Sequence, residues 1–198
     1  SLEMDMPQIA AKRLARLTGL SSTRLLMGTL NDGEYEKVAA GSVALETRPM
    51  QINRKPSATV ADIGHMARQV KGLRLVVVDY LGLIRPAEKG SRYETTTQIS
   101  NDLKALARSL AVPVLALAQL NRANEARTDK RPNMSDLRDS GAVEQDADGI
   151  LLLHSPAYYT QSVEEHKPWE PIPLEVTLAK NRHGGTGRCD MAAYLETC

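Results

Sequence analysis

Three polar side chains occupy positions where apolar strands are expected to end. Asp79 follows the valine-rich segment 73–78, and Gln119 lies near the end of a second apolar segment, residues 112–120. Glu3 stands at the start of the chain, where a strand ahead of the first helix would finish. Open α/β sheets bind ligands outside the carboxyl ends of their strands, so parallel strands would bring these groups to one edge.

Two acids and an amide at one sheet edge suit nucleotide hydrolysis. An aspartate after an apolar strand is a typical magnesium-binding group of nucleotide hydrolases. A nearby glutamate such as Glu3 can polarise water, and a glutamine such as Gln119 can sense a phosphate. The alternative without a functional role is that Asp79 only caps a loop, because apolar strands often end in aspartate.

The elements that must position these residues alternate along the chain. Helices are expected at residues 7–18, from Asp32 as cap to residue 43, 59–72, 93–112 and 141–148. Strands are expected at residues 49–54, 73–78, 112–120 and 149–154, followed by a closing hairpin of residues 174–180 and 187–195. The two inner apolar strands are expected to be buried on both faces. The pattern predicts an α/β fold, with a mostly parallel sheet flanked by helices.

The composition limits the classes of protein. With 198 residues, 42% of them hydrophobic, the chain can form one domain with a core, expected over residues 1–198. A formal net charge of +1 indicates neither a nucleic-acid nor a membrane partner by itself. The chain has no apolar run long enough to span a membrane and no signal peptide, and its two cysteines form no disulfide pattern. These features favour a cytoplasmic protein.

Five segments together carry a family resemblance. They are "SLEM", "VVVDYLGLI", "ISNDLKALARSLAVPVLALAQLNR", "DKRPNMSDLRDSGAVEQDADGILLLH" and "KNRHGGTG". In their order and spacing the chain resembles, over nearly its whole length, the C-terminal RecA-like motor domain of the DnaB-family replicative DNA helicases. The resemblance implies a RecA-like fold and an ATP-dependent helicase that uses ATP and Mg²⁺.

The resemblance also implies roles for five residues around the nucleotide. Glu3 corresponds to the catalytic glutamate that activates the attacking water, and Asp79 to the Walker B aspartate, which acts on magnesium through water. Gln119 corresponds to the glutamine that senses the γ-phosphate and couples it to DNA. Lys180 and Arg182 correspond to a lysine and an arginine finger that reach the neighbouring subunit's nucleotide, which implies a hexameric ring.

A second set of residues is implied to contact DNA. Arg138, Asp139 and Gly141 match the central loop that grips the phosphates of single-stranded DNA. Next to Gly141, a backbone amide can approach a phosphate closely because no Cβ intervenes. The alternatives without a functional role are that Arg138 and Asp139 form a surface ion pair and that Lys180 and Arg182 are ordinary exposed residues of a hairpin.

The chain departs from the family pattern at three points. Asp139 stands where the family usually has glutamate, and Gly82 where it commonly has glutamine. None of the 13 glycines is followed by lysine, so the phosphate-binding loop GxxxxGK[ST] is missing. We therefore expect an N-terminally truncated fold that begins after this loop and lacks the family's collar and linker helix. Such a chain should bind ATP poorly and hydrolyse it negligibly by itself.

Three functions remain open on the sequence. The first is a helicase motor that translocates along single-stranded DNA to unwind duplex, with a helicase loader and a primase as further partners. The second is a non-catalytic relic or interaction module that binds single-stranded DNA or helicase subunits. The third, another RecA-like ATPase for recombination or clock control, is disfavoured by the helicase-type segment "DKRPNMSDLRDSG".

Overall fold

The computed structural model describes residues 4–53, 55, 57–88, 90–121, 126–160, 170–194 and 197. The chain is divided into two compact units. The first, called the sheet unit, comprises residues 53–153 and 177–188; the second, called the helical unit, comprises residues 4–52, 154–176 and 189–198. That residues 1–198 form a single domain stays a prediction.

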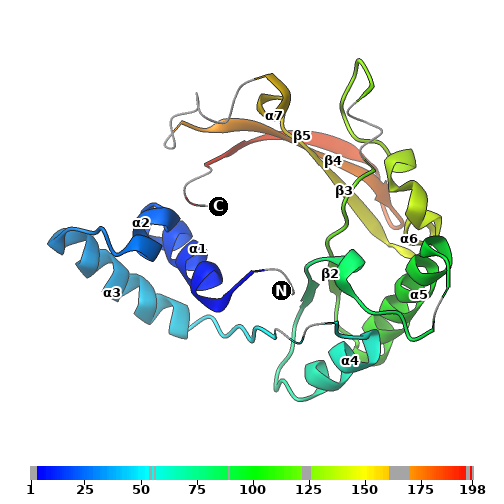
Figure 1. Ribbon diagram of the computed structural model, residues 1–198, viewed down its shortest axis with the longest axis horizontal. Coiled ribbons are helices and arrows are strands. Elements are labelled where there is room, and N and C mark those ends of the chain that lie inside the picture. Colours follow the sequence, from blue (N-terminus) through cyan, green and yellow to red (C-terminus); the bar gives the residue numbers. More distant parts are fainter. Residues whose placement is uncertain are drawn as a thin grey trace. The chain divides into compact units, whose positions relative to one another are not determined.

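The sheet unit contains a parallel strand pair. Strand β1 (Val76–Val78) pairs with β2 (Val114–Ala116), with Val76 opposite Val114 and Val78 opposite Ala116. Helices α4 (Val60–Arg68) and α5 (Arg92–Leu110; both in Figure 1) and the short turn η1 (Leu81–Leu83) form a core with the face of this pair that carries Val78. Their buried core consists of Val60, Val78, Leu81, Ile84, Ile99, Leu103 and Leu106.

Capping residues in the sequence define where α4 and α5 begin. Thr59 accepts the Asp62 amide while the Asp62 carboxylate accepts the Thr59 amide, and Ser91 and Glu94 repeat this capping box before α5. At Gly64, a Cβ would lie 2.9 Å from a Leu106 methyl carbon, so the glycine permits close packing of α4 on α5.

A second core joins the remaining elements of the sheet unit. Leu137, Ile150 and Leu152 form it. They come from η3 (Met134–Ser140) and β3 (Gly149–His154), which are connected by α6 (Gly141–Asp146). Strand β3 belongs to a three-stranded sheet of order β3-β4-β5, in which β4 (Ile172–Asn181) and β5 (Gly187–Ala193) form the expected closing hairpin.

The helical unit contains α1 (Met6–Thr18), α2 (Ser22–Met27), α3 (Asp32–Glu46) and the short α7 (Ala157–Thr160). Gly19 ends α1 in the left-handed conformation, as its position after the last helical residue indicates. The cap of α3 is Asn31 rather than Asp32, because the Asn31 side chain accepts the Glu34 amide at 3.0 Å. Helix α2 was not anticipated; its cap is Ser21.

Four other expectations about local structure were wrong. Residues 49–53 of the expected strand 49–54 are not in a strand, and Arg54 lies outside the described residues. The helix expected to reach Gly72 ends at Arg68, and the strand expected over 112–120 is limited to Val114–Ala116. The valine strand is not buried on both faces: Val78 is 5% exposed but Val77 is 52% exposed.

The described part of the chain contains no helix that is both long enough and apolar enough to cross a membrane.

Candidate functional site

The parallel strand pair brings two of the expected polar residues to one edge. Asp79 directly follows β1 and is half-buried, and Gln119 lies three residues beyond β2 and is exposed. Backbone hydrogen bonds continue past the strands: the Leu117 amide donates to the Val78 carbonyl at 2.9 Å, and the Leu81 amide donates to the Leu117 carbonyl at 2.9 Å. We call this the carboxyl edge. Glu3 lies outside the described residues.

The donor set at the carboxyl edge fits magnesium better than a metal held by protein alone. In the described ranges, no group of three or more His, Cys, Asp or Glu side chains is placed to hold a metal. Magnesium typically keeps several waters and binds through one or two carboxylates together with substrate phosphates. The single half-buried carboxylate of Asp79 therefore fits a hydrated ion that a bound nucleotide would complete.

The two expected fingers lie together at the C-terminal end of α6. Lys180 Nζ donates to the carbonyl oxygens of Glu144 at 2.5 Å and Gln145 at 3.1 Å. Arg182 Nη2 donates to the same Gln145 carbonyl at 2.9 Å. The last carbonyls of a helix lack partners within it and carry partial negative charge, so cations are favoured there. This explains locally why two basic residues from the hairpin meet at this helix end.

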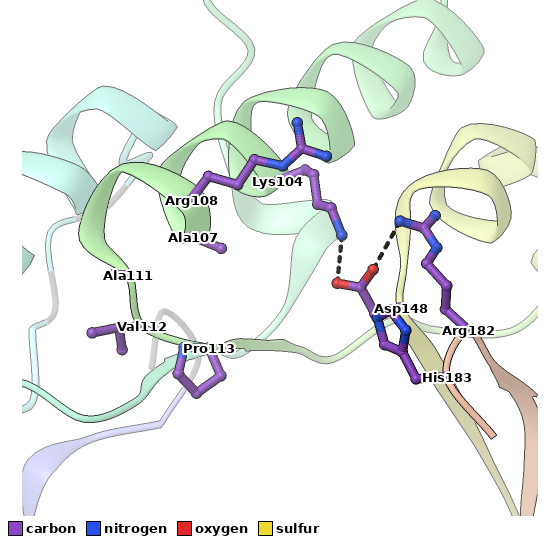
Figure 2. A pocket seen from close by; sticks show the side chains of 9 residues that line it. All are labelled: Lys104, Ala107, Arg108, Ala111, Val112, Pro113, Asp148, Arg182 and His183. Atoms are coloured by element: carbon purple, nitrogen blue, oxygen red, sulfur yellow. Dashed lines mark hydrogen bonds and ion pairs between the residues drawn. The ribbon is translucent and has the colours of Figure 1, made fainter.

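Asp148, two residues beyond α6, bridges Arg182 to α5. One carboxylate oxygen pairs with Arg182 Nη1 at 2.9 Å and the other pairs with Lys104 Nζ (Figure 2). The Arg182 backbone amide also donates to the Asp148 carbonyl at 2.7 Å. The hydrogen bond from Lys104, with the nearby charges of Lys104, Arg182 and His183, lowers the pKa of Asp148. We call Lys104, Asp148 and Arg182 the bridged cluster.

An open hollow of about 440 Å³ lies beside the bridged cluster. Its wall combines Arg182 and His183 with the end of α5 and with Val112 and Pro113, which precede β2 (Figure 2). Arg182 is therefore near the amino-terminal end of β2, whereas Asp79 and Gln119 follow the carboxyl ends of β1 and β2. The strands alone separate these ends by roughly 10 Å at about 3.3 Å per residue. Within the sheet unit, the basic finger and the carboxyl edge lie at opposite ends of the same strands.

A buried carboxylate organises the base of the expected DNA loop. Asp136 is 7% exposed and accepts hydrogen bonds from Arg127 Nη2 at 2.6 Å and from the Asn133 amide at 2.9 Å. Its carbonyl accepts the Asn121 amide at 3.1 Å. The loop is thereby tied to the segment that follows Gln119.

Of the expected DNA-binding residues, the structure gives full detail for Gly141. The side chains of Arg138 and Asp139 lie outside the described part. Gly141 begins α6 with an ordinary helical φ of −52°, and a Cβ there would come no closer than 3.9 Å to Tyr93. The fold itself has room for a side chain at this position, so internal packing does not require the glycine.

Sequence reasoning did not find the partners that hold these residues. Lys104 and Asp148 are 44 positions apart, and although both lie in segments that carry the family resemblance, nothing in those segments indicates that the two residues pair. Asp148 was expected to be the last residue of the helix 141–148, but the helix ends at Asp146, and nothing in the sequence indicated the partner of Asp148. No role was expected for Arg127 or Asp136.

Comparison with known proteins gives the family. The profile of the DnaB-like helicase C-terminal domain matches residues 1–197. The chain belongs to this family. Among curated relatives, the replicative DNA helicase DnaB of Geobacillus stearothermophilus is 38% identical over 201 residues, covering 99% of this chain and 43% of the relative. The replicative DNA helicase DnaC of Bacillus subtilis is 35% identical, with the same coverage of both chains. The chain thus spans less than half the length of these relatives.

Solved structures confirm the expected fold class. A solved ATPase domain superposes with a TM-score of 0.90 at 34% identity, covering 100% of this chain and 70% of that one. A DnaB-like replicative helicase, described together with its interactions with primase, superposes with a TM-score of 0.89 at 34% identity. That match covers 99% of this chain and 49% of the helicase. The fold is the α/β, RecA-like fold of these ATPase domains.

Proposed function

We propose that this chain is part of the ATP-driven motor of a replicative DNA helicase, which translocates along single-stranded DNA to unwind duplex. The observation that carries the proposal is the placement of Arg182 and Asp79 at opposite ends of β1 and β2. In a ring of identical subunits in one orientation, opposite faces of neighbours meet. Arg182 of one subunit then faces the carboxyl edge of the next, as a finger acting in trans requires.

Each residue of the carboxyl edge has a role in this proposal. Asp79 holds hydrated Mg²⁺ on the ATP phosphates, Gln119 senses the γ-phosphate, and Glu3 activates the attacking water. When bound, the ion neutralises charge that develops on the transferring phosphoryl group. Lys180 and Arg182 of the neighbouring subunit add positive charge on the opposite side, and an arginine finger is worth about 10³ to 10⁵ in rate.

The DNA contact is assigned to the loop before α6. Arg138 neutralises a phosphate, Asp139 orients the loop, and the backbone at Gly141 approaches a second phosphate. The hydrogen bond from Asn121 to Asp136 supports a direct mechanical link from Gln119 to this loop. We further propose a hexameric ring in the cytoplasm that works with a helicase loader and a primase; a DnaB-like relative has been described with primase.

The 198-residue chain is not expected to hydrolyse ATP by itself. None of its 13 glycines is followed by lysine, so it offers no phosphate-binding loop of the GxxxxGK[ST] form. The second candidate function is a non-catalytic module that binds single-stranded DNA or helicase subunits. The two functions differ in whether the residues of the chain support turnover when the rest of a motor is supplied.

A chimera supplies that context. Residues 1–197 replace the matching stretch of the Geobacillus stearothermophilus helicase, and ATP hydrolysis, ring assembly and unwinding are measured. Two variants are then made in the chimera. Asp79→Asn removes the magnesium ligand but keeps the finger, and Arg182→Ala removes the finger but keeps the magnesium ligand.

Mixing the two inactive variants tests the proposal directly. In a mixed ring, some sites combine Asp79 of an Arg182→Ala subunit with Arg182 of an Asp79→Asn neighbour. We expect ATP hydrolysis to reappear on mixing, whereas each variant mixed with itself stays inactive. If rings form but mixing restores nothing, the finger does not act in trans. An unsubstituted chimera that binds DNA but shows no hydrolysis supports the non-catalytic module.

A further inference from the structure

The contacts of Arg182 are more extensive than a finger on a surface hairpin requires. Nη1 pairs with Asp148 at 2.9 Å, Nη2 donates to the Gln145 carbonyl at 2.9 Å, and its backbone amide donates to the Asp148 carbonyl at 2.7 Å. One aspartate thus fixes both the backbone and the guanidinium group of the same residue. The planar guanidinium has five N–H donors in a rigid fork, so contacts at two of its nitrogens restrict the position and orientation of the group.

Asp148 is itself held from the other side. Its second carboxylate oxygen pairs with Lys104, whose side chain is only 20% exposed. Lys104 lies on α5, and Leu103 and Leu106 of the same helix are in the buried core. Figure 2 shows the Asp148 carboxylate between Lys104 and Arg182. Through Lys104, the carboxylate is attached to a helix that is anchored in the core of the sheet unit.

We propose that Asp148, oriented by Lys104, is a positioning residue that holds the Arg182 guanidinium in the geometry needed to act on the neighbouring subunit's nucleotide. The inference rests on the proposed function and adds two residues to it. Asp148 touches neither nucleotide nor DNA in this scheme; it acts through Arg182. Arginine has many rotamers, so a finger ordered before the phosphate arrives avoids the entropy cost of ordering at the moment of reaction.

Ion pairing alone would be a weak reason to assign this role. Asp148 and Arg182 have side chains that are 54% and 40% exposed, and pairs of this kind contribute little to folding stability. The effect of the pair is therefore expected in turnover rather than in stability. That contrast distinguishes a positioning role from a merely structural one.

The kinetic test uses the chimera described above. Asp148→Asn keeps the size of the side chain but removes its charge, and we expect kcat for ATP to fall roughly tenfold with KM for ATP little changed. Lys104→Met is expected to give a smaller fall, and Asp148→Glu to recover part of the loss. The double variant Asp148→Asn with Arg182→Ala should be no slower than Arg182→Ala alone, because Asp148 has no other route to the reaction.

Asp146→Asn is the matched control. Asp146 lies at the same end of α6 and accepts a hydrogen bond from Ser100 of α5 at 2.7 Å, so it links the same two helices without a cation. We expect its kcat to match that of the unsubstituted chimera. A fall as large as that of Asp148→Asn would show that any acid linking α5 to α6 matters, and would overturn the inference.

A spectroscopic measurement on the 198-residue chain removes the dependence on turnover. The guanidinium NMR signals of Arg182, assigned by their loss in Arg182→Ala, should show greater mobility in Asp148→Asn and unchanged mobility in Asp146→Asn. Unchanged mobility in Asp148→Asn overturns the inference.

The outcomes for the two proposals are distinguishable. If Arg182→Ala slows hydrolysis but Asp148→Asn does not, the finger stands and the positioning role fails. If Arg182→Ala itself leaves hydrolysis unchanged, the finger fails, and the positioning role fails with it. Both proposals are supported if Asp148→Asn increases the mobility of the Arg182 guanidinium and if its fall in kcat does not add to that of Arg182→Ala.

Discussion

The carboxyl edge and the bridged cluster are built in different ways. Asp79 and Gln119 are placed by backbone hydrogen bonds between and beyond two parallel strands, above a core of large apolar side chains. Arg182, in contrast, is placed by side chains and carbonyls from α5, α6 and the segment before β3. The geometry of the carboxyl edge therefore depends on strand pairing and on burial of apolar side chains, whereas the geometry of the bridged cluster depends on charge.

This difference predicts different responses to mutation. A backbone-defined edge tolerates replacement of its polar side chains, because the strands and core position whatever residue follows them. A charge-defined cluster loses geometry as soon as one partner is changed, although the fold remains. The experiments below test whether function and stability separate in this way.

The largest effect is expected at Asp79. In the chimera, Asp79→Asn should lower kcat for ATP about 10³-fold, because it removes the carboxylate that holds the Mg²⁺ ion, and the ion is what neutralises the developing charge. The midpoint of urea unfolding should stay unchanged, since Val78 and not Asp79 is in the core. Phosphate release and urea titrations measure both. Raising the Mg²⁺ concentration serves as a check: partial recovery of kcat is expected if Asp79 helps to hold the ion, and a loss that no Mg²⁺ concentration changes would contradict that role.

The next largest effect is on folding, in the larger core of the sheet unit. Leu106 is 6% exposed in the larger core, so Leu106→Ala should lower the free energy of unfolding by about 2 to 5 kcal/mol. Val77→Ala, on the exposed face of β1, is the matched control and should cost far less. Urea unfolding followed by circular dichroism compares them. Equal costs would mean that the exposed face of β1 is covered in solution.

A smaller effect is expected where α6 begins. Gly141→Ala adds a Cβ that the fold accommodates, so stability should stay the same or rise by less than about 1 kcal/mol. Binding of single-stranded DNA by the chimera should weaken roughly tenfold if the adjacent amide contacts a phosphate. Fluorescence anisotropy at several salt concentrations measures the affinity.

The salt dependence then separates Gly141 from its neighbour Arg138. Gly141→Ala removes no charge, so the slope of log affinity against log salt should not change. Arg138→Ala removes one phosphate contact and should reduce the slope by about 0.7. An unchanged slope for Arg138→Ala, with unchanged affinity for Gly141→Ala, would remove the DNA loop from the proposed function.

The contrast between the two regions also explains what the sequence could reveal. Apolar periodicity and capping residues indicated α1, α4, α5, β1 and the closing hairpin, because these elements are determined by local spacing and burial. The position of Asp79 followed directly, since it needs only a strand before it. Errors fell where local signals compete: Asn31 and Asp32 both suit a cap, and only the extended backbone at residue 31 decides between them.

The bridged cluster could not be predicted from the sequence, because its contacts are not determined by local spacing. Lys104 looks like any solvent-facing lysine on an amphipathic helix, and its partner Asp148 is distant in sequence. The exposed face of β1 was missed because three consecutive valines carry no alternation, although Val77 and Val78 are 52% and 5% exposed. Apolar periodicity indicates which side chains are buried, whereas the formation of ion pairs between distant residues depends on the tertiary arrangement.

The smallest effect is expected on the stability of the bridged cluster, and its pH dependence has a definite sign. Lys104 lowers the pKa of Asp148 below its ordinary 3.8, so the folded state favours the carboxylate. The resulting stabilisation is present above pH 3.8 and is lost as the pH falls below that value, where the folded state too becomes protonated.

Asp148→Asn should therefore unfold like the unsubstituted chain at the most acidic pH and be slightly less stable near neutrality, by under about 1 kcal/mol. Urea titrations at a series of pH values measure the difference, which about 1 M salt should reduce further. A large loss of stability at neutral pH would contradict this, and would mean that the cluster holds the fold together rather than only orienting Arg182.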